Sequence, residues 1–194
     1  MILIAVGAPL FVAASTSFSG GGFLGFFIAV IYMEHFLFAT VSVAEEKYKG
    51  AALLCATPYT RNALVKAKYI SSLVVFIITY IIYTTMTFVG HLGIEKVNIF
   101  TFGIALMIIS IIWGAIIPTQ YKFGYENTKY ISVIIIVLSV MVVPNILKWL
   151  STENINLDIT MPQIIQNLLP YLIALVVSLV SMIISTNIYA KKDL

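Results

Sequence analysis

The chain has 194 residues, of which 61% are hydrophobic and 10% are charged, with a formal net charge of +3. Soluble domains are about 45–50% apolar and about 25% charged, so this composition excludes an ordinary water-soluble domain, a disordered chain and a charged coiled coil. The charged residues are clustered, and the apolar runs between them are on the order of 20 residues, the length that crosses a bilayer. The sequence therefore predicts a polytopic membrane protein.

Residue counts exclude several kinds of site. Cys55 is the only cysteine, so the chain has no intramolecular disulfide and no zinc or iron–sulfur site with several cysteine ligands. His35 and His91 are the only histidines, without the H-E-x-x-H spacing of a zinc protease. A positive net charge is also typical of nucleic-acid binding, but here the basic residues lie in short connections between apolar runs. We therefore expect contact with membrane lipid, no metal site and no nucleic acid.

Six apolar runs follow one another along the chain. The first is short for a span, yet a signal peptide would need a basic segment before it, so we expect that an upstream basic anchor is missing and that the N-terminus is incomplete. Pro118 is expected to close the fourth run, Pro144 stands near the end of the fifth, and residues 147–166 are expected to form a polar loop. The predicted spans are residues 1–14, 23–43, 69–89, 99–117, 130–143 and 168–190.

Positive charge alternates between the connections. Nine basic residues lie after the second, fourth and sixth runs, and only Lys96 and Lys148 lie in the opposite connections. Because cytoplasmic loops carry an excess of Lys and Arg, both termini and residues 44–68 are expected to be cytoplasmic. Continuous apolar runs favour helices over the alternating strands of a barrel, so the expected fold is an all-α bundle of six transmembrane helices, one domain over residues 1–194. The nine are Lys47, Lys49, Arg61, Lys66, Lys68, Lys122, Lys129, Lys191 and Lys192.

Residues 44–68 predict two helices separated by a turn. Glu45 and Lys49 stand at i and i+4 in the order that stabilises a helix. Pro58 ends this helix, and Thr60 can cap a second one that begins at Arg61 and continues into the third span. A short amphipathic helix in this position can lie on lipid or insert into a groove on a partner protein.

The same residues resemble a known family. The pattern E-E-K-x-K, then L-L, P-x-T-R and V-x-A-K-Y is similar to the first cytoplasmic loop of type-2 ABC transporter permeases. This resemblance implies six spans, a second permease copy or paralogue, and two cytosolic ABC ATPase subunits, on which a coupling helix in this loop docks. The matching positions are Glu45, Glu46, Lys47, Lys49, Leu53, Leu54, Pro58, Thr60, Arg61, Val65, Lys68 and Tyr69.

The resemblance also assigns roles within residues 44–68, which we call the coupling segment. The chain has no G-x-x-x-x-G-K-[ST] phosphate loop, so we expect no catalysis and no cofactor here, with ATP and Mg bound by the partner ATPase. The expected ATPase-coupling residues are Glu45, Glu46, Lys49, Leu53, Leu54, Pro58, Thr60 and Arg61.

Polar residues inside the spans are candidates for a substrate path. An ionisable residue within a membrane is costly, so Glu34 is a candidate to bind a cationic part of the substrate or a proton; the alternative is a neutral or paired side chain that locks helix packing. Tyr80, Tyr83 and Thr87 form a stripe on the third span that either lines a path or packs against neighbouring helices. Two small-residue stripes are expected to make close helix contacts, and one of them is a candidate interface between permease copies. They are Ser178, Ser181 and Ser185, and Gly21, Gly25 and Ala29.

The resemblance implies the membrane subunit of an ATP-driven exporter in a bacterial cell membrane. The compact chain suits small hydrophobic or amphipathic cargo, such as antimicrobial or cytolytic peptides or drugs. One alternative is a proton-coupled secondary transporter that uses Glu34, which transport without an ATPase would favour. Another is an intramembrane enzyme similar to CAAX-type proteases, suggested by Glu45 and Glu46 but mismatched at Gly50; metal-dependent activity lost in Glu46→Ala would favour it.

Overall fold

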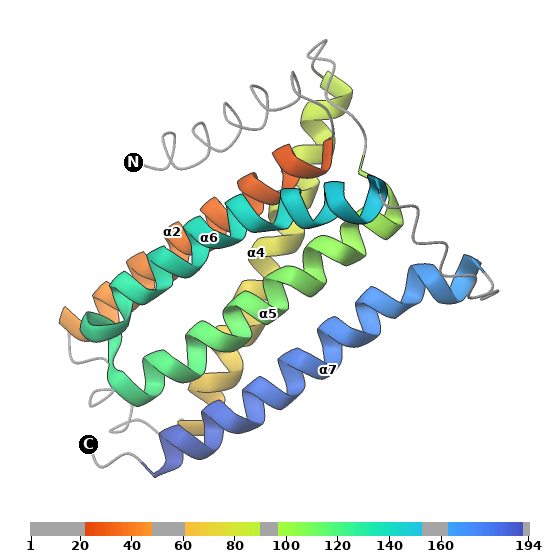
Figure 1. Ribbon diagram of the computed structural model, residues 1–194. Helices are drawn as coiled ribbons and strands as arrows, with labels where there is room; N and C mark the ends of the chain where they lie inside the picture. Colours follow the sequence, from red (N-terminus) through yellow and green to blue (C-terminus); the bar gives the residue numbers. More distant parts are fainter. Residues whose placement is uncertain (1–21, 48–60, 90–96, 153–162, 192–194) are drawn as a thin grey trace.

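Five long helices make up the described part of the chain. The computed structural model describes residues 22–47, 61–89, 97–152 and 163–191 (Figure 1). Each helix in these ranges has a stretch long and apolar enough to cross a membrane, and the described ranges contain no strand. The all-α prediction is confirmed, whereas the expected first span, residues 1–14, lies outside the described residues. The helices are α2 (Gly22–Lys47), α4 (Arg61–Val89), α5 (Ile99–Phe123), α6 (Tyr125–Thr152) and α7 (Gln163–Ala190).

The helix boundaries follow the prediction at Arg61 and depart from it at two prolines. α4 begins at Arg61, where Pro58 and Thr60 predict a helix start. α5 continues through Pro118 to Phe123, so the prediction that this span closes at Pro118 is wrong. α6 likewise runs through Pro144, and residues 147–152 and 163–166, predicted as loop, are helical.

The membrane setting explains why these helices continue past proline. Proline removes one backbone N–H, but a helix that ended within a bilayer would leave several N–H and C=O groups without partners. In α5, the carbonyl deprived by Pro118 is that of Gly114, four residues earlier, and Ser181 of α7 donates a hydrogen bond to it at 2.7 Å. Thr119 donates to the neighbouring Ala115 and Ile116 carbonyls, which further satisfies this turn.

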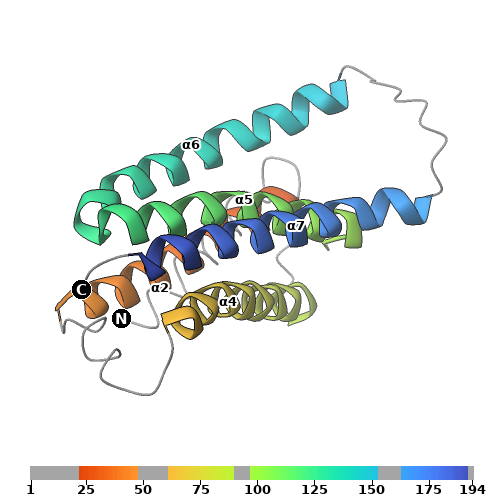
Figure 2. The same cartoon turned by 90° about the horizontal axis from the view of Figure 1, so that it is seen from below.

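The helices pack in three layers. Figure 2 shows α6 on one side and α4 on the other, with α2, α5 and α7 between them. The most extensive contact is between α5 and α7, and two glycines of α5 face α7 there. A Cβ at Gly103 would lie 2.7 Å from the Tyr171 ring, and one at Gly114 would lie 3.5 Å from Ser181. The bare backbone at Gly103 therefore lets the Tyr171 ring lie directly against α5.

Basic residues gather at one end of this bundle. α2, α5 and α7 end there, and α4 and α6 begin there (Figure 1). We call it the basic end, because these helix termini carry most of the lysines and arginines of the described residues. Gly124 makes the sharp turn from α5 to α6 at this end with φ of 83°, a backbone conformation that residues with a Cβ rarely adopt. The alternation of charge predicted from the sequence therefore corresponds to a common end in space.

Candidate functional site

The two ends of the coupling segment are joined by an ion pair at the basic end. Lys68, in the second turn of α4, contacts the Glu45 carboxylate in the last turn of α2, with Nζ 2.7 Å from Oε2. The Lys68 side chain is 9% exposed and also lies over the rings of Phe38 and Tyr121, at 5.2 and 5.1 Å from their centroids. A buried ammonium needs such compensation, so this arrangement holds the C-terminus of α2 and the N-terminus of α4 together.

Tyr69, the residue after Lys68, connects α4 to α7 and α5 through a series of hydrogen-bonded hydroxyl groups. The Tyr69 hydroxyl lies 2.6 Å from Ser181 Oγ and 2.9 Å from Ser185 Oγ. Ser181 must donate its one hydrogen to the Gly114 carbonyl, so Tyr69 donates to Ser181 and accepts from Ser185. The order Ser185, Tyr69, Ser181, Gly114 carbonyl, which we call the hydroxyl chain, thus ties the start of α4 to α7 and α5.

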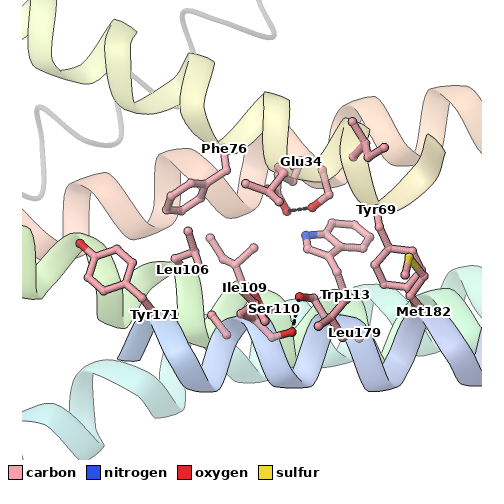
Figure 3. A pocket seen from close by; sticks show the side chains of 17 residues that line it. Glu34, Tyr69, Phe76, Leu106, Ile109, Ser110, Trp113, Tyr171, Leu179 and Met182 are labelled. Atoms are coloured by element: carbon pink, nitrogen blue, oxygen red, sulfur yellow. Dashed lines mark hydrogen bonds between the residues drawn. The ribbon is translucent and has the colours of Figure 1, made fainter. Parts of the chain in front are cut away.

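A mostly apolar cavity of about 400 Å³ lies beside this network, between α4, α5 and α7. Figure 3 shows Phe76, Ile109 and Trp113 among its walls. Ile70 of α4 and Leu175 of α7, both more than half exposed, belong to its rim. Because exposed apolar residues of transmembrane helices face lipid, the cavity is bounded by helices that also face the bilayer.

Glu34 of α2 brings a carboxylate to this cavity. Its side chain is 3% exposed, Ser72 Oγ donates to its Oε2 at 3.2 Å, and the Trp113 indole nitrogen is turned toward it (Figure 3). Its other oxygen, Oε1, has no hydrogen-bond partner among the described residues. A smaller cavity of about 200 Å³ on its other side is lined by Phe38, Lys68 and Ser72 among others. Glu34 therefore lies between two cavities with one oxygen unsatisfied.

A family model described as "ABC-2 family transporter protein" matches residues 1–190, nearly the whole chain. The chain belongs to the ABC-2 transporter family. Neither the curated proteins nor the solved structures contain a match to it. Membership, together with the five apolar helices of the described residues, makes this chain a multi-pass membrane component of a transporter. This class is generally not itself catalytic and generally works with ABC ATPases. The family resemblance carried by the coupling segment is thereby confirmed.

The predicted coupling residues of this ABC-2 permease lie partly outside the described residues. Lys49, Leu53, Leu54, Pro58 and Thr60 fall in residues 48–60, and their role remains a prediction. Glu46 is exposed at the end of α2, and Arg61 is the first residue of α4. Glu45, which the sequence pairs with Lys49, is bonded to Lys68 in the structure.

The tyrosines of the predicted path belong to an aromatic cluster and are not part of the cavity lining. Tyr80 and Tyr83 make edge contacts with the ring of Phe26, at centroid distances of 5.9 and 5.3 Å. Thr87 donates to the carbonyl of Thr84 in its own helix. The cavity beside Glu34 does not include these three residues in its lining, so the structure brings Glu34 together with other side chains than those predicted.

Sequence reasoning did not select Ser72 and Trp113 as partners of Glu34. Both come from other helices, and no local spacing relates a residue of α2 to one of α4 or α5. Tyr69 could have been singled out from the sequence, because it belongs to the family pattern at the start of the third span. Its hydroxyl partners, Ser181 and Ser185, were also indicated by the sequence, as part of a small-residue stripe predicted to make close helix contacts.

Proposed function

We propose that this ABC-2 permease is the membrane subunit of an ATP-driven bacterial exporter. It works with a second permease copy or paralogue and two cytosolic ATPase subunits, with its basic end and both termini at the cytoplasmic side. The observation that carries the proposal is the joining of the coupling segment to the bundle through Glu45, Lys68 and Tyr69. Family membership supports the ATPase partner, and the clustering of basic helix termini supports the orientation.

The contacts indicate how a movement of the coupling segment is transmitted to the transmembrane helices. An ATPase that moves residues 48–60 acts on the end of α2 and the start of α4 together, because Glu45 and Lys68 join them. The motion of α4 passes to α7 and α5 through the hydroxyl chain. Those three helices bound the cavity, so a shift of α4 relative to α7 changes its width and access. Packed helices slide or rotate as units, which makes this a rigid-body mechanism.

The proposed cargo is small and hydrophobic or amphipathic, such as antimicrobial or cytolytic peptides or drugs. The apolar walls of the cavity and the exposed apolar residues on its rim support entry from the bilayer. A molecule that partitions into lipid would reach such a cavity sideways between α4 and α7.

Docking of the coupling segment can be tested by co-purification with the ATPase. We expect Leu54→Asp or Arg61→Glu to detach the ATPase or abolish stimulated ATP turnover, while detergent elution and helix content stay unchanged. Glu126→Gln is the matched control, since Glu126 pairs with Lys129 on an exposed face of α6. Unchanged co-purification and unchanged turnover in both coupling variants would contradict the docking role.

The buried Glu34 favours one second candidate, a proton-coupled secondary transporter. Transport measurements in proteoliposomes that contain the permease alone distinguish the secondary transporter from the ATP-driven exporter. Uptake or efflux driven by a proton gradient without ATPase, and lost in Glu34→Gln, would support the secondary transporter and contradict the ATP-driven one.

A further inference from the structure

The unsatisfied oxygen of Glu34 is the feature with the most specific chemistry in the described part of the chain. Oε1 is buried and unpartnered, while Oε2 is occupied by Ser72. A carboxyl group held in an apolar region either takes up a proton or is compensated by a donor or a cation. The Trp113 indole nitrogen is turned toward the carboxylate, but Oε1 has no hydrogen-bond partner among the described residues, and Phe76 and Ile109 of the cavity walls are apolar. The described part of the chain therefore leaves Oε1 available to a cation or a hydrogen-bond donor.

Lys68, which lines the small cavity on the other side of Glu34, is already engaged. Its ammonium is bonded to Glu45 and lies over two aromatic rings. Moving it to Glu34 would break the ion pair that joins α2 and α4. The large cavity has a volume of about 400 Å³, and its lining includes the exposed residues Ile70 and Leu175. That volume lies within the range of about 300–1,000 Å³ typical of sites for drug-sized ligands.

We infer that this cavity binds an apolar molecule that carries one protonated amine, with an ammonium N–H donating to Glu34 Oε1 and the apolar body against Phe76, Ile109 and Trp113. A neutral analogue lacks the charge, and a quaternary ammonium has the charge without the donor, so both bind more weakly. This inference names the substrate class of the proposed transporter and rests on it for its biological role.

Energy transfer from Trp113 to a bound probe tests the inference. The chain has two tryptophans, so Trp149→Phe leaves Trp113, which lines the cavity, as the only tryptophan that can transfer excitation energy to the probe. The full permease without ATPase, in lipid vesicles, is titrated with dansylcadaverine, a dansyl group on a primary amine. Its N-acetyl and N,N,N-trimethylammonium derivatives serve as the neutral probe and the donor-free cation.

In Trp149→Phe protein we expect saturable transfer with an affinity for the amine at least about tenfold above that for the acetylated probe. This factor corresponds to one charge-assisted hydrogen bond. Adding Glu34→Gln should bring the ratio close to one, because the amide keeps the shape of the side chain and an acceptor for Ser72 but loses the charge. Adding Glu126→Gln, a carboxylate on an exposed helix face, should leave the ratio unchanged.

A second variant tests the position of the probe independently of Glu34. Ser178 lines the cavity, and Ser178→Phe fills part of it, so binding of the amine and acetylated probes should fall together. Equal affinities of amine and acetylated probe in the Trp149→Phe protein, or a ratio that Glu34→Gln leaves intact, would overturn the inference. A trimethylammonium probe that matches the amine would overturn the requirement for an N–H donor.

The outcome is separable from that of the proposed function. The probe measurement contains no ATPase and no nucleotide, whereas the co-purification test contains no cargo. Amine-selective binding in a permease that recruits no ATPase would leave the site standing and contradict the ATP-driven transport. The reverse pattern would contradict only the site.

Discussion

Ser181 Oγ of α7 donates a hydrogen bond of 2.7 Å to the Gly114 carbonyl of α5, the one carbonyl that Pro118 leaves without its helical N–H. Gly114 also has no side chain to hold the helices apart, and a Cβ there would be in ordinary contact with Ser181 at 3.5 Å. One proline on α5 and one serine on α7 therefore form a complementary pair at the place where these helices pack.

We predict that Ser181→Ala lowers the free energy of unfolding by about 1–3 kcal/mol, because it leaves the buried Gly114 carbonyl without a donor and removes one of the two hydrogen bonds of the Tyr69 hydroxyl. The measurement is reversible unfolding in mixed micelles. Ser178→Ala, whose hydroxyl bonds only within its own helix to Leu175, should change stability by a few tenths of a kcal/mol. In a Pro118→Ala background the new N–H can bond Gly114, so the Ser181→Ala effect should shrink. An equal effect in both backgrounds would show that the carbonyl is not the group that matters.

The ion pair between Glu45 and Lys68 should contribute to both stability and coupling. Glu45→Gln leaves a mostly buried ammonium without its counter-charge, so we expect a loss of about 1–3 kcal/mol in unfolding free energy. Its exposed neighbour offers a matched control, and Glu46→Gln should cost less than about 0.5 kcal/mol. The exchanged pair Glu45→Lys with Lys68→Glu should recover part of the ATP turnover that either single change loses. No recovery, with both single variants as stable as the parent chain, would argue against the pair.

The two glycines of α5 that face α7 should respond differently to alanine. At Gly103 a Cβ would meet the Tyr171 ring at 2.7 Å, and that ring is held because its hydroxyl donates to the Ile99 carbonyl at 2.6 Å. We expect Gly103→Ala to destabilise by about 1–3 kcal/mol in thermal unfolding. Gly114→Ala should be neutral or slightly stabilising, since its Cβ has room and alanine favours helix. Tyr171→Leu should relieve the Gly103→Ala defect, and a defect that persists would locate the strain elsewhere.

Gly124 should not tolerate a side chain. Its backbone, at φ 83° and ψ 163°, is in a region that is essentially confined to glycine, so Gly124→Ala should cost about 1–3 kcal/mol. A Cβ at this position would have no neighbouring side chain or helix within 4 Å, so any loss of stability reports backbone strain and not a clash. Circular dichroism during heating is sufficient to measure it. Wild-type stability in this variant would mean that the turn has another conformation available.

Local signals predicted the features that depend on neighbouring residues along the chain. The start of α4 at Arg61 follows from Pro58 and Thr60, because a proline restricts its own surroundings and a cap acts within one turn. The same reasoning was wrong at Pro118 and Pro144, where the helix continues. The helix can continue past Pro118 because the freed Gly114 carbonyl has a partner, the hydroxyl of Ser181, which is 67 positions from Gly114 along the chain.

The amino-acid sequence by itself determined that the chain is apolar enough to lie in a membrane, that its basic connections alternate, and that its coupling segment matches the ABC-2 family. These properties depend on composition and order alone. Tertiary structure decided the partner of Glu45, the direction of the hydroxyl chain and the placement of Glu34 between two cavities. Each of these depends on which faces of separate helices meet, and within lipid every face is similarly apolar, so hydropathy does not distinguish them.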